Sequence, residues 1–366
     1  MSADGDLAPG PLIGAPVPWF AAPTDVNARF QFHTAAGRWI ALAFLGSLRA
    51  PQNAAFMEML RARRDLFDDR TASFFGVGVD PAEESLLVTE LPGLRYFRDY
   101  NRAVSRAYGA ARENDPTYRP FVLLIDRTLR LTDAAPIAQA EALFDRLSAR
   151  LGPEADPPIT EHPPVLIAPR IFEPELCARL IAYFHAGAPK PSGFMREVDG
   201  RTVPVLDNSF KSRNDATIDD ETLRLETQAR VRERLIPLVE RAFGWRATRM
   251  ERHIVARYAA DENGHFNPHR DNTTRGTAHR KFAVTINLNA EDYDGGDLRF
   301  PEFGQRTYRA PTGGAVVFGC SLLHEATRVT RGERFAFLPF LYDEAGAKLR
   351  EANAGYVDNS ASEYKA

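Results

Sequence analysis

Two histidines, an aspartate and an arginine in the last third of the chain have the types and order of a metal site beside an anion site. His269 and Asp271 are separated by one residue, and His324 and then Arg334 follow further along. Two imidazoles and one carboxylate on one face of an ion leave the opposite face open, as in non-haem Fe(II) enzymes. A planar guanidinium nearby suits a carboxylate. These residues predict metal-dependent oxidation chemistry.

The local sequence around these residues predicts strand ends. Pro268 and Gly264 flank the His-x-Asp segment, and side chains two apart on an extended backbone point the same way, so both can bind one ion. A surface histidine beside a surface acid explains the tripeptide alone equally well. His324 follows an apolar strand-like run, residues 315–319, that can return to the same place and favours the metal site.

Arg334 opens the apolar, strand-like run 334–341. Alternation places it opposite Phe335 and Phe337, where burial is costly unless the arginine meets an anion. Tyr258 closes another predicted strand, residues 252–258, and its hydroxyl can reach the same anion. A core tyrosine with a solvated tip fits Tyr258 equally well.

Residues 282–288 alternate between large apolar and small or polar side chains. Thr285 and Asn287 share the second face, which suits a strand that lines a wet cleft. We therefore predict that both contribute to the co-substrate pocket, although an ordinary solvent-facing strand has the same pattern.

Composition limits the class of protein. The 366 residues exceed the usual size of one domain, the apolar fraction is 44% and the net charge is −3. This balance predicts neither nucleic-acid nor membrane-surface binding. The two cysteines, Cys177 and Cys320, lie in apolar runs typical of buried free thiols. No signal peptide or membrane span is evident, so we expect a cytoplasmic protein.

A segment rich in proline and acidic residues, 153–165, predicts a linker between two domains, 1–152 and 166–366. The first domain alternates predicted strands with helices, which indicates an α/β fold. The strands are residues 39–44, 72–79 and 121–125, and the helices are residues 53–66 and 138–151.

The second domain begins with helices and continues with many short strands. Predicted helices run from Pro174 to Gly187 and from Asp219 to Phe243, with a kink expected at Pro237. Beyond residue 251 glycine and proline interrupt the pattern repeatedly. This order favours a jelly roll supported by helices.

The first domain resembles the thioredoxin fold, and more closely the peroxiredoxins. Residues 16–20 resemble their entry motif, 37–44 their first core strand, and 121–126 a later strand and turn. A peroxiredoxin needs a thiolate after that first strand, but residues 45–55 contain no cysteine, nor does any residue before Cys177. We therefore expect a redox-inactive domain used for docking or assembly.

Residues 251–342 resemble the Fe(II)/2-oxoglutarate dioxygenases of the prolyl 4-hydroxylase type. Three motifs occur in the family's order: a tyrosine followed by His-x-Asp in 258–271, a strand and a Gly-Gly-x-Leu-x-Phe turn in 283–300, and His…Val-Thr-x-Gly-x-Arg in 324–334. The resemblance implies a double-stranded β-helix. An arginine occupies the place of the lysine that is frequent in this family.

The resemblance also implies the roles of individual residues. His269, Asp271 and His324 would bind Fe(II), and Arg334 with Tyr258 would bind the distal carboxylate of 2-oxoglutarate, with L-ascorbate as a further cofactor. No catalytic side chain beyond the metal ligands is expected.

The expected reaction is hydroxylation of a prolyl residue or a small molecule, with release of succinate and carbon dioxide. The alternative is a metal-binding interaction module without turnover, docked through the thioredoxin-like domain. An oxygenase that does not use 2-oxoglutarate is a further alternative. Residues 190–215 fit either a substrate lid or a surface loop, and a homodimer is possible.

Overall fold

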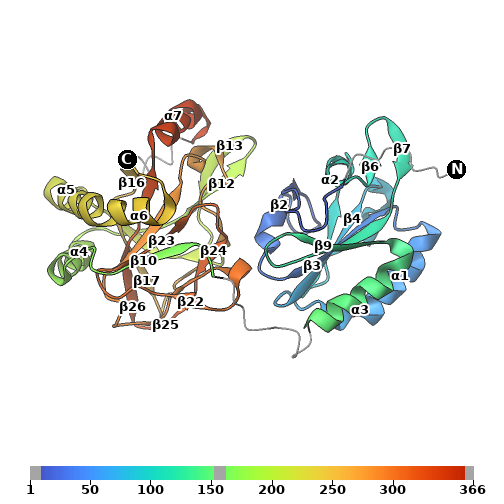
Figure 1. Cartoon of the computed structure of the whole chain (residues 1–366), viewed down its shortest axis with the longest axis horizontal. Helices are drawn as coiled ribbons and strands as arrows, with labels where there is room; N and C mark the ends of the chain where they lie inside the picture. Colours follow the sequence, from blue (N-terminus) through green and yellow to red (C-terminus); the bar gives the residue numbers. More distant parts are fainter. Residues whose placement is uncertain (1–9, 152–161, 359–366) are drawn as a thin grey trace. The chain divides into compact units, whose positions relative to one another are not determined.

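The computed structural model describes residues 10–151 and 162–358, which fold as two compact units that divide after residue 161 (Figure 1). The predicted linker, 153–165, lies outside the described residues as far as residue 161. Its last residue, Val165, is already the first residue of a strand. The domain boundaries therefore remain a prediction.

The first unit contains a five-stranded mixed sheet with the strand order β5-β4-β3-β8-β9. Its central strand β3 pairs parallel with β4, as its continuous apolar run predicts, but antiparallel with β8. The bounds are β3 (Trp39–Gly46), β4 (Ala72–Gly78), β5 (Leu94–Arg98), β8 (Phe121–Ile125) and β9 (Leu131–Pro136).

Helices α1 (Pro51–Ala62) and α3 (Ala140–Leu151) lie side by side on one face of this sheet (Figure 1). The rings of Phe56 and Phe144 join them, with centroids 6.1 Å apart. Both faces of β3 are buried, which is why it lacks polar alternation. The remaining elements are α2 (Ala103–Ala107), β1 (Ala21–Ala22), β2 (Phe30–Gln31), β6 (Ala111–Arg112) and β7 (Asp115–Tyr118).

The second unit is built from two sheets. The larger, nine-stranded sheet follows β10-β23-β19-β26-β17-β15-β11, with β16 and β27 attached, and the smaller follows β14-β18-β24-β21-β22. The larger sheet comprises β10 (Val165–Ala168), β11 (Lys190–Pro191), β15 (Asn214–Thr217), β16 (Arg249–Glu251), β17 (Ile254–Ala259), β19 (Phe282–Asn287), β23 (Ala315–Gly319), β26 (Glu333–Phe337) and β27 (Phe340–Tyr342).

The smaller sheet carries the predicted metal ligands. It comprises β14 (Lys211–Ser212), β18 (His265–His269), β21 (Leu298–Arg299), β22 (Thr307–Tyr308) and β24 (His324–Ala326). Two antiparallel pairs complete the strands: β12 (Phe194–Val198) with β13 (Arg201–Val205), and β20 (Asp294–Gly295) with β25 (Val329–Arg331). The first pair shows that part of residues 190–215 is an ordered hairpin.

Helices α4 (Pro174–Ala186), α5 (Glu221–Arg230) and α6 (Ile236–Phe243) lie on one side of this unit (Figure 1). A π-helical turn, Val231–Leu235, joins α5 to α6 just before Pro237. Because proline lacks the N–H that continues an α-helix, the expected kink is realised as this turn. The last helix is α7 (Glu344–Asn353).

The core of the second unit lies between these helices and the larger sheet. Leu180 and Leu235 from the helices pack with Ile286, Phe335 and Phe337 from the strands. The opposite faces of the same strands are thereby directed toward the smaller sheet. Both predicted architectures, the thioredoxin-like α/β domain and the jelly roll with supporting helices, are confirmed. No helix among the described residues is long and apolar enough to cross a bilayer.

Candidate active site

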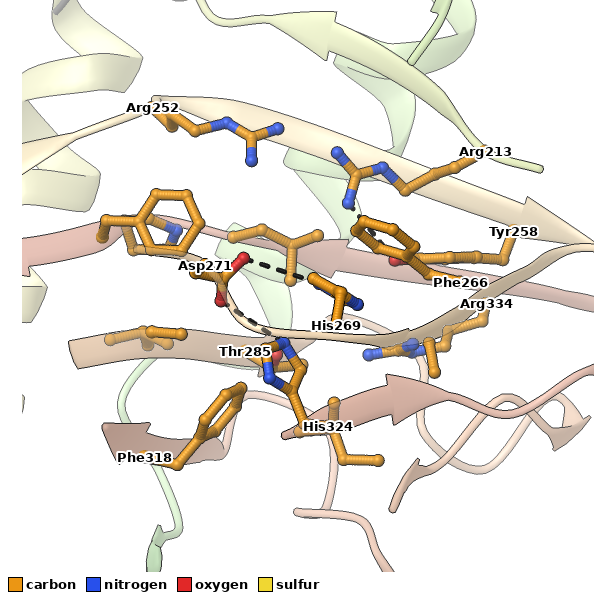
Figure 2. A pocket seen from close by; sticks show the side chains of 17 residues that line it. Arg213, Arg252, Tyr258, Phe266, His269, Asp271, Thr285, Phe318, His324 and Arg334 are labelled. Atoms are coloured by element: carbon orange, nitrogen blue, oxygen red, sulfur yellow. Dashed lines mark hydrogen bonds and ion pairs between the residues drawn. The ribbon is translucent and has the colours of Figure 1, made fainter. Parts of the chain in front are cut away.

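The three predicted metal ligands come together at one edge of the smaller sheet (Figure 2). His269 ends β18 and lies directly opposite His324, the first residue of β24. An irregular register between Phe266 and His269 bends β18 at this point. The Asp271 N–H donates to the carbonyl of Cys320, which fixes the chain just beyond the strand.

The geometry of this cluster fits one small cation. Nε2 of His269 lies 3.5 Å from Oδ1 of Asp271, and Nε2 of His324 lies 3.3 Å from Oδ2. Donor atoms that share one ion at roughly 2 Å lie about 3 Å apart when they occupy adjacent positions. The donor set is therefore close to binding geometry before any metal is considered.

Backbone carbonyls orient both imidazoles. Nδ1 of His269 lies 2.8 Å from the carbonyl oxygen of Asn267, and Nδ1 of His324 lies 3.0 Å from that of Leu322. Protonation at Nδ1 satisfies each carbonyl and leaves the lone pair on Nε2, which faces the cluster. The Phe266 ring stacks on His269 at a centroid distance of 3.5 Å and restricts its rotation.

Electrostatics keep the donors in their ligand forms. Burial and the neighbouring His269 lower the pKa of His324 to about 4, so this imidazole is neutral at pH 7. Burial would raise the pKa of Asp271, but His324 and His269 hold it below its ordinary value, so the carboxylate is ionised. A neutral imidazole and an ionised carboxylate are the forms that bind metal.

Arg334 and Tyr258 occupy directly opposed positions on β26 and β17 and line the same pocket as the three candidate ligands. Arg334 is only 2% exposed, and neither its Nε nor its Nη1 has a hydrogen-bond partner among the described residues. Its guanidinium does interact with the Tyr293 hydroxyl. A buried guanidinium with two free nitrogens fits the carboxylate predicted from the sequence.

Tyr258 lies between two arginines. Arg334 lies over its ring at 4.9 Å, and Nη1 of Arg213 donates to its hydroxyl at 3.2 Å. Because the hydroxyl oxygen accepts this bond, its own proton is free to point elsewhere in the pocket. Tyr258 thus lines the pocket and also packs in a buried apolar cluster. Its contact with the co-substrate stays a prediction.

The structure separates the two polar residues of β19. Thr285 lines the main pocket. Asn287 borders a smaller adjoining cavity that also touches Arg334, and its amide donates to the Ala310 carbonyl at 2.7 Å. This bond gives Asn287 a structural task. Direct co-substrate binding by either residue stays a prediction.

Sequence reasoning did not identify Arg252 as a pocket residue, and it placed Arg213 only within the segment 190–215, interpreted as a lid or a surface loop. Both guanidinium groups line the pocket. The alternation that pairs Tyr258 with Ile254 and Ala256 continues back to Arg252, so the pattern contained this information. Arg213 lies between two short strands and offered no comparable pattern.

In the first unit, a buried carboxylate accepts hydrogen bonds from the loop that follows β3. Glu83 is 1% exposed and accepts hydrogen bonds from the Ser47 hydroxyl and from the N–H groups of Leu48 and Arg49. This segment contains no thiol. Both cysteines lie in the second unit and, as predicted, are free and buried.

A two-histidine, one-carboxylate cluster between the sheets of a jelly roll, with a buried arginine beside it, defines a non-haem iron oxygenase type of domain. Comparison with known families agrees. Residues 253–342 match the 2OG-Fe(II) oxygenase superfamily, and residues 13–134 match the AhpC/TSA family. Each of the two regions therefore matches a family of the kind that the sequence resembles, and both resemblances are confirmed.

Individual relatives match parts of the chain. A PKHD-type hydroxylase of Shewanella frigidimarina (strain NCIMB 400) is 48% identical over 52 residues, which are 14% of this chain and 23% of the relative. The chain thus spans about a quarter of that protein's length.

Two solved structures are more distant. A prolyl hydroxylase from Trichoplax adhaerens, in complex with a hypoxia inducible factor peptide fragment, is 17% identical over 51% of this chain and 86% of its own, with a TM-score of 0.38. A thiol peroxidase from Chromobacterium violaceum is 14% identical over 39% of this chain and 91% of its own, with a TM-score of 0.33.

Proposed function

We propose that the protein is an Fe(II)- and 2-oxoglutarate-dependent dioxygenase that hydroxylates a prolyl residue or a small molecule. One observation carries the proposal: Arg334, buried with two unpartnered nitrogens, lines the same pocket as His269, Asp271 and His324. A metal site alone fits many proteins. A metal site next to an unmatched buried cation fits a chelating co-substrate that carries a second carboxylate.

The residues of the chain have separate tasks in this scheme. His269, Asp271 and His324 would hold Fe(II) through one face, and Arg334 with the Tyr258 hydroxyl would bind the distal carboxylate. When bound, the two cofactors supply oxidative decarboxylation to succinate and carbon dioxide, coupled to oxygen transfer to a C–H bond. Phe266 and Phe318 exclude water from the imidazoles. L-Ascorbate would serve as the reductant that keeps the iron ferrous.

Succinate formation tests the proposal. Purified protein is incubated with Fe(II), ascorbate and 2-oxoglutarate, and succinate is measured against a His269→Ala variant. We expect uncoupled succinate production that is absent in the variant. Wild-type protein that binds Fe(II) but forms no more succinate than the variant would show that the domain is the alternative, a binding module without turnover.

We further propose that the first domain has no thiol chemistry of its own. The carboxylate of Glu83 occupies the N–H groups of the loop in which a peroxiredoxin requires its thiolate. The experiment is a peroxide-consumption assay with a thiol reductant. Cys177 and Cys320 lie in the second unit, so consumption that a Cys177→Ser, Cys320→Ser double variant abolishes would not come from the first domain. Consumption that persists in this variant above a protein-free control would contradict this part of the proposal.

A further inference from the structure

The pocket contains more positive charge than the metal and co-substrate require. Three guanidinium groups line it, those of Arg213, Arg252 and Arg334, whereas Asp271 is the one carboxylate among its lining residues. Arg334 is accounted for by the distal carboxylate of 2-oxoglutarate. Figure 2 shows Arg213 and Arg252 on one side of the His269–Asp271 pair and His324 on the other.

Arg213 and Arg252 share a single carboxylate. Oδ2 of Asp215 accepts a hydrogen bond from Arg213 at 2.7 Å and from Arg252 at 3.2 Å. The side chains of the two arginines are only 3% and 9% exposed. This trio therefore carries one formal positive charge in a poorly solvated environment, where electrostatic interactions are strong because the effective dielectric constant is low.

Loading the site with its cofactors does not remove this charge. The two charges of Fe(II) and that of Arg334 balance the two carboxylates of 2-oxoglutarate and that of Asp271. The surplus positive charge of the Arg213–Asp215–Arg252 trio remains. Lys211 is also buried and donates to the Ser192 hydroxyl, which accepts from Arg213 as well, so this neighbour adds no negative charge. Burial holds the pKa of the Lys211 ammonium well below its usual range, which disfavours a second positive charge here.

The backbone holds Arg252 in a strained conformation. Its φ is 64°, in the left-handed region that residues other than glycine rarely adopt, at the junction between β16 and β17. Its guanidinium lies 5.4 Å from the centre of the Phe340 ring, which also lines the pocket. Strain that persists at a pocket-lining residue is typical of a functional position.

We propose that the substrate is a small molecule carrying a carboxylate, and that Arg252, supported by Arg213, binds this carboxylate beside the metal. A single surplus charge matches a monoanionic carboxylate better than a dianionic phosphate. This inference rests on the proposed function and specifies its substrate.

The test compares acids with matching neutral amides. The full-length protein is loaded anaerobically with Fe(II) and 2-oxoglutarate and titrated calorimetrically with a panel of N-acetyl-L-amino acids and their carboxamides. We expect the acids to bind at least tenfold more tightly than the amides. N-acetyl-L-prolinamide resembles a prolyl residue within a peptide, so tighter binding of this amide than of N-acetyl-L-proline would overturn the inference.

Variants localise the preference. Arg252→Met should remove the acid-over-amide preference, and Arg252→Lys should retain part of it, since the charge remains but the planar fork is lost. Arg213 keeps its bond to Asp215 in both variants, and thermal unfolding checks that they fold. Arg249→Met is the matched control, because Arg249 is an exposed arginine of β16 paired with Glu344.

The outcomes separate the two proposals. A preference that survives Arg252→Met, or that Arg249→Met also removes, overturns the role of Arg252. Equal binding of acids and amides overturns the carboxylate substrate. In each case, uncoupled succinate production by the wild-type protein would leave the proposed oxygenase function intact. The proposed function is refuted only if the wild-type protein forms no more succinate than the His269→Ala variant.

Discussion

Replacing Arg334 should damage co-substrate binding without damaging the fold. Methionine keeps much of the length of the side chain and removes its charge. Two nitrogens of Arg334, Nε and Nη1, are buried without partners and are available to the carboxylate. Hydrogen bonds between charged groups contribute about 1.5–3 kcal/mol each. Nε and Nη1 lie on different edges of the guanidinium, so one carboxylate accepts from one of them. The loss is then about 1.5–3 kcal/mol, on the order of a ten- to hundredfold loss of affinity for 2-oxoglutarate.

The stability of the metal-free protein should respond in the opposite direction. A buried guanidinium with unmatched donors costs free energy, and replacing buried charges with apolar groups is often neutral or stabilising by about 1–4 kcal/mol. We therefore expect Arg334→Met to unfold at the same temperature as wild type or higher. A variant that loses both affinity and stability would indicate a structural arginine.

The assay is succinate formation as a function of 2-oxoglutarate concentration, with calorimetric titration of the anaerobic Fe(II) protein as a second measurement. Arg331→Met is the control, because Arg331 is an exposed arginine of β25 paired with Asp294. A KM for 2-oxoglutarate within threefold of wild type in Arg334→Met would refute the reasoning. That result would favour an oxygenase that does not use 2-oxoglutarate.

Three further predictions concern buried polar groups outside the metal cluster. Glu251 is 1% exposed and pairs with Arg280 and His279. Glu251→Gln leaves Arg280 without its carboxylate and should therefore lower the free energy of unfolding in urea by about 3–5 kcal/mol. A loss under about 1 kcal/mol would contradict this. Burial lowers the pKa of His253 to about 4. The folded state therefore favours the neutral ring. This preference contributes about 3 kcal/mol to the free energy of unfolding above the unfolded pKa near 6.5, and the contribution is lost as the pH falls toward 4. If stability depends on pH in His253→Gln as it does in the wild type, the reasoning is refuted. Asn287→Ala should lower the free energy of unfolding by about 1–3 kcal/mol, because it leaves the Ala310 carbonyl unpaired. An unchanged stability in urea unfolding would rule out this contribution.

The periodicity of the sequence placed Arg334, Tyr258 and Thr285 on strand faces that line the pocket. Strand alternation put Arg334 opposite Phe335 and Phe337, and the structure has the two rings in the core and the arginine in the pocket. The same alternation, continued back from Tyr258 through Ala256 and Ile254, reaches Arg252. Arg252 was already part of the predicted strand 252–258, but nothing in the sequence assigned it a role in the pocket.

Other features could not be obtained from local patterns. The amide of Asn287 donates to the carbonyl of Ala310, which belongs to a different segment of the chain. This hydrogen bond therefore depends on the tertiary fold, which brings the two segments together. Likewise, the mixed pairing of β3 depends on the direction in which β8 enters the sheet. Residue types and spacing specify which side chains share a face, but not which backbone groups lie opposite them.

The sequence by itself determined which chemical groups this protein has available: the candidate metal donors, the arginine proposed to bind the co-substrate, and the lack of a thiol before Cys177. These follow from residue identity and from the period of two along a strand. Only the tertiary structure decided how charges are shared. Asp215, Arg213 and Arg252 meet through contacts between separate segments, and the surplus charge that points to an acidic substrate exists only because the fold gives two arginines one carboxylate.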